Sequence, residues 1–189
     1  MLTVTRVDWN DRQLGDVGCL HGTGLISNLI IASETAAHEV LDGTTWSHCF
    51  IAGCALADDQ QSLDLSDPRI LEAVFPKISL SPYDEYDGQT TALFRIGVDP
   101  ALIQQVLLQV ILEYVGRGYD VGGVAFGMAA MELARALCLP ADNNVFANQH
   151  QAWCSELATD FIQKLIADPD KPSTEDPQQV YNYLNALTA

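Results

Sequence analysis

The chain has 189 residues, of which 48% are hydrophobic, 25 are acidic and 9 are basic, for a formal net charge of -16. This length predicts a single domain, residues 1–189, that can bury a sizeable core. The strong negative charge excludes nucleic acid as an expected partner and disfavours anionic membrane surfaces.

Segments for targeting or membrane insertion are not expected. The N-terminus lacks a basic head followed by a long apolar run, and no apolar stretch approaches the length of a membrane span. The cysteine number is odd, and no two cysteines form a CxxC pair; they are Cys19, Cys49, Cys54, Cys138 and Cys154. These features predict a cytoplasmic protein with reduced thiols and no stable membrane insertion.

The first half of the chain predicts strands around one helical segment. Residues 14–20 predict a short strand after a Gly-Asp turn, and residues 25–31 have helical spacing on their apolar face. The nearly continuous apolar run at 46–57 predicts a buried strand. Residues 70–75 predict another strand, after the turn-like pair Asp67-Pro68.

The second half of the chain is mainly helical by the same criteria. Residues 90–98 predict a strand, and Asp99-Pro100 then opens a helix, because Asp caps a helix and Pro suits its first turn. A glycine-rich loop follows at 116–127, and residues 128–137 have a helical pattern. The amphipathic stretch from Cys154 to Ile166 predicts a further helix. The core therefore spans about 14–166, and the fold class is α+β.

Residues 167–189 differ in composition from this core. Three prolines among acidic residues indicate a linker, and residues 178–187 predict a short final helix. The Pro- and acid-rich composition is more typical of a disordered linker than of a docking segment.

Cys154 is the candidate nucleophile. At the first turn of a helix, unpaired N–H groups and the helix dipole stabilise a thiolate and an oxyanion formed from a carbonyl substrate. His48 is the candidate base, and an imidazole needs a polar group that fixes its tautomer and orientation. Glu72 is the candidate for that third role, because a carboxylate among apolar strand residues is costly without a partner.

Each residue also has an interpretation without catalysis. A cysteine at a helix start often packs as a small apolar residue, a histidine in a strand is often hydrogen-bonded in the core, and Glu72 lies on the surface if its strand assignment is wrong. His150, four residues before Cys154, is a rival base. Zinc needs more ligands than His48, Cys49 and Cys54 offer, so neither a metal nor another cofactor is expected.

Four segments together resemble a known family. They are 15–27 (Gly-Asp-Val…Gly-Thr-Gly-Leu-Ile-Ser), 46–48 (Trp-Ser-His), 70–73 (Ile-Leu-Glu-Ala) and 153–157 (Trp-Cys-Ser-Glu-Leu). In this order they resemble the permuted papain-fold branch of the NlpC-type thiol hydrolases, the YiiX/YebB-like proteins. The resemblance implies a circularly permuted papain-like fold, with a small antiparallel sheet or barrel packed against helices. It also implies a catalytic triad of Cys154, His48 and Glu72.

The same resemblance suggests a role for Tyr119. The segment 118–123 (Gly-Tyr-Asp-Val-Gly-Gly) is similar to the tyrosine-containing loop of NlpC-type peptidases, which implies that Tyr119 is a second donor to the oxyanion. The alternative is a tight loop whose glycines permit positive φ.

The expected activity is cleavage of an amide, thioester or ester through an acyl-enzyme. The implied substrate is a peptide, a cell-wall peptide or a lipid-like acyl compound. Two alternatives remain open: an acyltransferase on the same scaffold, with a lipid or amine acceptor, and an inactive binding or assembly protein.

Overall fold

A computed structural model describes residues 3–24, 27–28, 30–31, 43–119, 151–166 and 176–188, which have an α+β fold. The strands are β1 (Val4–Val7), β2 (Val17–Leu20), β3 (His48–Leu56), β4 (Leu63–Val74), β5 (Lys77–Pro82), β6 (Thr91–Ile96), β7 (Gly118–Tyr119) and β8 (Gln151–Ala152). The helices are α2 (Pro100–Tyr114), α4 (Cys154–Leu165) and α5 (Pro177–Ala186), with a 3-10 turn, η1 (Trp9–Asp11).

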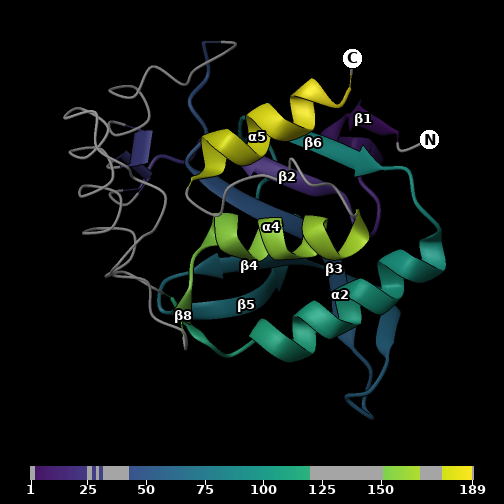
Figure 1. The fold of residues 1–189 in the computed structure, drawn as a ribbon. Helices are drawn as coiled ribbons and strands as arrows, with labels where there is room; N and C mark the ends of the chain where they lie inside the picture. The colour runs from purple at the N-terminus through teal and green to yellow at the C-terminus, as the bar shows by residue number, and fades with distance from the viewer. Residues whose placement is uncertain are drawn as a thin grey trace, which may run out of the picture.

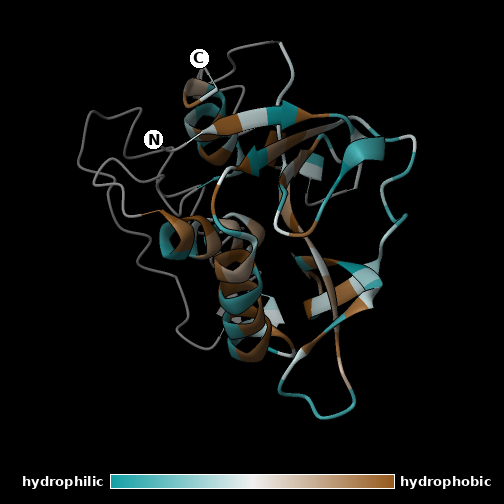
Figure 2. Cartoon of the chain, turned by 90° about the vertical axis from the view of Figure 1, so that its right-hand side faces the viewer, coloured by the Kyte–Doolittle hydropathy of each residue, from teal (hydrophilic) through white to brown (hydrophobic). Residues whose placement is uncertain are grey.

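The strands form one sheet in the order β1-β6-β2-β3-β4-β5-β7-β8. All neighbouring strands are antiparallel except β7 and β8, which are parallel. The three helices lie on one side of this sheet, with α4 between α5 and α2 (Figures 1 and 2). An antiparallel sheet with helices on one face is the α+β architecture that the sequence predicts.

The two faces of the sheet have separate apolar clusters, because successive strand residues point to opposite faces. On β3, Cys49 and Ile51 belong to the large core that also contains the buried faces of the helices. Phe50, between them, belongs to a smaller cluster with Ile70 and Tyr86 on the other face. The sheet is therefore buried on both sides near the start of β3.

Several predicted elements are confirmed. The strand predicted at 46–57 is β3, and the strand predicted at 90–98 is β6. Helix α2 begins after Asp99, whose side chain accepts a hydrogen bond from the Ala101 N–H at 2.9 Å, as an N-cap does. The helices predicted near 154–166 and 178–187 are α4 and α5.

The prediction of a turn at Asp67-Pro68 is wrong. Both residues lie within β4, where the pairing register with β3 shifts between Cys54 and Ala55. A bulge of this kind tolerates a proline inside a strand, because the ladder hydrogen bonds are interrupted there. The sequence patterns also missed β1 and β5 entirely, and Tyr119 lies in β7 rather than in a loop.

Other predictions fall outside the described residues. These are the helix at 128–137, most of the glycine-rich loop and most of the linker after residue 166. Within the described part of the chain, none of the helices has the length and apolar character needed to cross a membrane.

The packing of Gly18 on β2 against Phe50 on β3 gives a stability test. The two residues are register partners, and a Cβ atom on Gly18 would overlap the Phe50 ring. We expect Gly18→Ala to lower the free energy of unfolding by about 1–3 kcal/mol, the usual cost of overpacking. The measurement is urea unfolding followed by circular dichroism.

The matched control is Gly53→Ala on β3. A Cβ atom there would meet the Leu71 Cβ at 3.6 Å, an ordinary contact, so no loss of stability is expected. Equal unfolding midpoints for the Gly18 variant and wild type would show that Phe50 can move aside without cost.

Candidate active site

The centre of the site is a buried carboxylate. Glu72 on β4 is 2% exposed, and its Oε2 atom lies 2.9 Å from Nε2 of His48 on β3. The Tyr86 hydroxyl donates a hydrogen bond to the same oxygen. An ionised carboxylate is retained in such a position only when charged or hydrogen-bonding partners compensate its lost hydration. The geometry therefore pairs two of the residues that the sequence selected.

Sheet geometry explains why His48 and Glu72 meet. Phe50 is the register partner of Glu72, and His48 is two residues before Phe50 on the same strand. Side chains two residues apart share a face, so His48 and Glu72 are diagonal neighbours across two antiparallel strands. His48 is also the first residue of β3, which leaves its ring at an end of the strand.

Cys154 is the first residue of α4, which follows β8 directly (Figure 1). Trp153, the N-cap residue, has an extended backbone and makes no side-chain capping hydrogen bond. By contrast, Asp99 and Asp176 cap α2 and α5 with their carboxylates. Cys154 is buried, and α4 packs against β3, which brings its thiol beside His48.

The surroundings of His48 strongly favour its protonated form. Burial by itself would lower its pKa, but the charge of Cys154, hydrogen bonding with Cys154 and the partner Glu72 together raise the pKa to about 10. Because Nε2 faces Glu72, Nδ1 is the ring nitrogen left for the thiol. An imidazolium held between a carboxylate and a cysteine is an arrangement that activates a thiol nucleophile.

The contacts of Glu72 favour its ionised form, and the contacts of Tyr86 favour its protonated form. Burial would raise the pKa of Glu72, but hydrogen bonds and charge from His48, with further hydrogen bonds from Ser81 and Tyr86, lower it. Burial and the neighbouring Glu72 carboxylate raise the pKa of Tyr86, so its hydroxyl keeps the proton that it donates.

Tyr86 is a site residue that the sequence analysis missed. It lies in the turn between β5 and β6, and its ring packs 6.0 Å from the His48 ring and 5.1 Å from the Phe50 ring, centroid to centroid. Nothing in its local sequence indicates a partner 14 positions earlier in the chain. The one local signal for a functional residue is that the turn combines tyrosines with several acidic residues.

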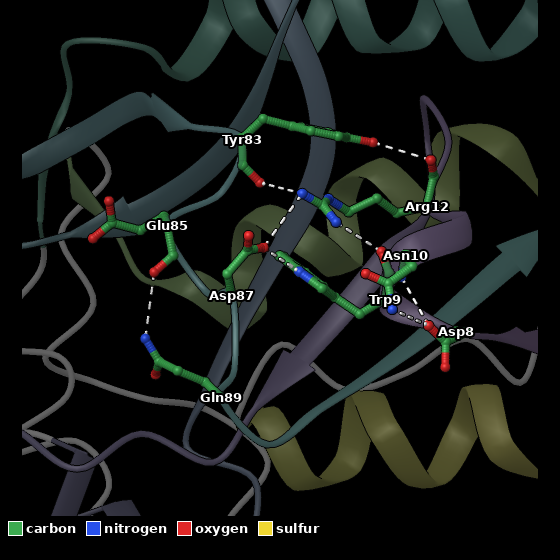
Figure 3. Close-up of polar contacts among 8 residues, drawn as sticks. All are labelled: Asp8, Trp9, Asn10, Arg12, Tyr83, Glu85, Asp87 and Gln89. Atoms are coloured by element: carbon green, nitrogen blue, oxygen red, sulfur yellow. Dashed lines mark hydrogen bonds and ion pairs between the residues drawn. The ribbon is translucent and has the colours of Figure 1, made fainter.

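A cluster of contacts around Arg12 fixes the turn that carries Tyr86 (Figure 3). The Arg12 guanidinium donates hydrogen bonds to the carbonyl oxygens of Trp9 at 2.8 Å and Tyr83 at 3.0 Å, and the Tyr83 hydroxyl donates to the Arg12 carbonyl at 3.1 Å. The Trp9 indole donates to Asp87 at 2.6 Å, and Arg12 pairs with Asp87 at 3.5 Å. Residues on both sides of Tyr86 are thus held against η1.

Tyr119 lies close to the start of α4 because of strand pairing. Tyr119 on β7 is the register partner of Ala152 on β8, two residues before Cys154. The two ends of the segment 120–150 therefore lie side by side, although they are distant in sequence. Tyr119 is buried and lines the same cavity as His48 and Tyr86. Its role as an oxyanion donor stays a prediction.

The remaining sequence candidates lie elsewhere. Cys49 and Cys54 are buried in β3 and belong to the large core, as expected for packing residues. His150, the rival base, lies outside the described residues. In the part of the chain that the structure describes, no three histidine, cysteine or acidic side chains group as metal ligands would.

The charge state of His48 can be measured directly. We expect the imidazole nitrogens of His48 to titrate near pH 10 in the wild-type protein, as its raised pKa requires. In Cys154→Ser the pKa should fall, because the negative charge that opposes the effect of burial is removed. The measurement is a nitrogen-15 NMR titration, and a wild-type His48 that titrates at its ordinary value of 6.5 would contradict the pairing.

The hydrogen bond from Tyr86 gives a second test, through the pH dependence of stability. A carboxylate with a lowered pKa stabilises the fold above its unfolded-state pKa, and this stability is lost as the pH falls through the folded-state value. Tyr86→Phe keeps the ring but removes the donor to Glu72, so the folded-state pKa of Glu72 should rise toward the unfolded-state value. The acid loss of stability should then be smaller and should be complete at a higher pH. The measurement is the free energy of unfolding between about pH 3 and pH 7.

Tyr83→Phe is the matched control for this variant. It removes a hydrogen-bonded tyrosine hydroxyl from the same turn, but one that donates to the Arg12 carbonyl rather than to Glu72. Its acid transition should keep the wild-type midpoint. The same upward shift in both variants would mean that the turn, and not the bond to Glu72, is responsible.

Comparison with known proteins identifies no family for this chain. Neither the protein-family models nor the curated proteins contain a match to the sequence. Over the residues that the structure describes, the fold is α+β, with a mainly antiparallel sheet and the helices α2, α4 and α5 on one side of it.

Proposed function

We propose that the protein is a cysteine hydrolase that cleaves an amide, thioester or ester bond through an acyl-enzyme on Cys154. The observation that carries the proposal is the position of His48, whose Nε2 atom lies 2.9 Å from the buried Glu72 carboxylate and whose electrostatic surroundings include Cys154. A base between a nucleophile and an orienting carboxylate is the common arrangement of a catalytic triad.

The chain order supports a circularly permuted papain-like fold as part of this proposal. His48 and Glu72 come first, on two adjacent strands, and Cys154 follows at the start of a helix packed against the same sheet. In papain-like enzymes the cysteine helix precedes the histidine strand.

In the proposed first step, the Cys154 thiolate attacks the substrate carbonyl carbon and forms a C–S bond. The carbonyl π electrons move to the oxygen, and the backbone N–H groups in the first turn of α4 stabilise the resulting oxyanion. When the oxyanion collapses, the bond to the leaving group breaks and the His48 imidazolium gives its proton to the departing nitrogen, oxygen or sulfur. Glu72 stabilises the imidazolium before this transfer.

In the second step, water hydrolyses the thioester. Neutral His48 takes a proton from the water, whose oxygen bonds to the acyl carbon, and the C–S bond then breaks. The carboxylic acid leaves, and the proton held by His48 restores the imidazolium and thiolate pair. Tyr119 is proposed as a second donor to the oxyanion in both steps, because it lines the same cavity as His48.

The test of the proposal is the alkylation rate of each cysteine by iodoacetamide across pH, mapped by mass spectrometry. We expect Cys154 to react faster than Cys19, Cys49 and Cys54, because it is the cysteine whose thiolate His48⁺ can stabilise. His48→Ala should remove this advantage.

Turnover provides the second readout. Cys154→Ala should abolish hydrolysis without unfolding the protein, and Glu72→Gln should lower kcat by about 10²-fold or more because the imidazolium loses its counter-charge. The matched control is Cys54→Ala, which removes a buried thiol from β3 outside the site. A Cys154 that reacts like the other cysteines, in a protein without turnover, would support the binding-protein alternative instead.

A further inference from the structure

A cavity of about 150 Å³ opens beside the ring of His48. Its apolar walls come from the end of β2, from the end of β4 with the residue that follows it, and from Ile30. The residues are Leu20, Ile30, Ala73, Val74 and Phe75. Tyr86 and Tyr119, the two tyrosines of the candidate site, complete the lining together with Ser27 and Ser47. The cavity and the proposed reaction centre therefore share a wall.

We infer that this cavity binds a compact, uncharged apolar group attached to the reacting carbonyl of the substrate. The inference rests on the proposed function, because it assigns a substrate class to the same site. A carbonyl carbon attacked by Cys154 must lie within reach of His48, which transfers the proton. A substituent a few bonds away from that carbon then falls into the space beside the His48 ring.

Several polar groups in the lining are already used within the protein. The Ser47 hydroxyl accepts a hydrogen bond from the Gly22 N–H at 3.0 Å and donates to the Leu20 carbonyl at 3.4 Å. The Tyr86 hydroxyl donates to Glu72. Both hydroxyls form hydrogen bonds with other groups of the protein, so the surface that these side chains offer to a ligand is largely carbon. A polar substituent would lose its hydration there without equivalent replacement.

The size of the cavity limits the group that it holds. A cavity of about 150 Å³ lined by aliphatic and aromatic side chains accommodates a benzene ring. A phenyl ring or a branched aliphatic group of four carbons therefore fits within the cavity, whereas a long-chain acyl group would extend beyond it.

The charge of the protein disfavours an acidic substrate group in this cavity. The positive charge of the His48 imidazolium is already balanced by the Glu72 carboxylate and by Cys154, and the whole chain has a net charge of -16. A carboxylate on the substrate would be repelled and would lose its hydration in an apolar cavity. The expected substrates carry an apolar rather than an acidic group beside the carbonyl.

The experiment uses four thioesters of N-acetylcysteamine, a small polar leaving group, with acetyl, 3-methylbutanoyl, phenylacetyl and succinyl as the acyl groups. Product release is measured by chromatography, and the acyl-enzyme on Cys154 is measured by mass spectrometry. We expect kcat/KM for the 3-methylbutanoyl and phenylacetyl thioesters to exceed that for acetyl by at least about tenfold. Succinyl, which is similar in size but charged, should react no faster than acetyl.

A pair of surface variants locates the preference. Phe75 lines the cavity and is 67% exposed, so Phe75→Ser removes apolar wall area without disturbing the core. It should reduce the phenylacetyl-to-acetyl ratio of kcat/KM by about threefold or more. Leu112→Ser on α2, also an exposed apolar residue at 56%, should leave this ratio at its wild-type value.

The outcomes separate the two proposals. Equal rates for all four thioesters, with Cys154 acylated, would overturn the apolar subsite and leave the hydrolase intact. A preference that survives Phe75→Ser unchanged would also overturn the subsite, because another surface would then be responsible. Acylation of Cys154 by none of the thioesters, together with ordinary alkylation of its thiol, would overturn the hydrolase and the subsite together.

Discussion

The burial of the Glu72 carboxylate is the constraint on which the site depends. A charge that is 2% exposed destabilises the fold unless its partners compensate the lost hydration, and His48 and Tyr86 provide that compensation at the same oxygen. The His48 ring is consequently fixed at Nε2, which leaves Nδ1 for the thiol. The orientation of the proposed base is thus a requirement of stability as well as of chemistry.

The site draws on residues from both sides of β3. Cys49 and Ile51 face the helices and belong to the large core, which also contains Cys154. Phe50, on the same face of β3 as His48, belongs to the smaller cluster that contains Tyr86. The alternation allows the sheet to be anchored by apolar packing on one side while polar partners are arranged on the other. The contacts of Arg12 with Tyr83 and Asp87 then fix the turn that carries Tyr86.

Local patterns predicted the elements whose sequence agrees with their surroundings. The Asp99 cap, the buried run of β3 and the amphipathic α4 each follow from a few adjacent residues. The patterns failed where distant pairing decides the outcome: Asp67-Pro68 reads as a turn but is accommodated by a bulge opposite β3. His48, Glu72 and Cys154 became candidates through their residue types, their predicted elements and the order of their motifs. Tyr86 instead depends on a turn held by Arg12, which is 71 positions from Tyr83.

The parallel pairing of β7 with β8 has a consequence for how this fold can be modified. Because Gly118 and Tyr119 lie beside Gln151 and Ala152, the chain positions on either side of residues 120–150 are neighbours in the sheet. A crossover between parallel strands needs only about a dozen residues, so this segment is much longer than the connection requires. The junction is therefore a natural graft point, at which evolution or an engineer can exchange the residues between β7 and β8 while the His48–Glu72 pair on β3 and β4 keeps its geometry.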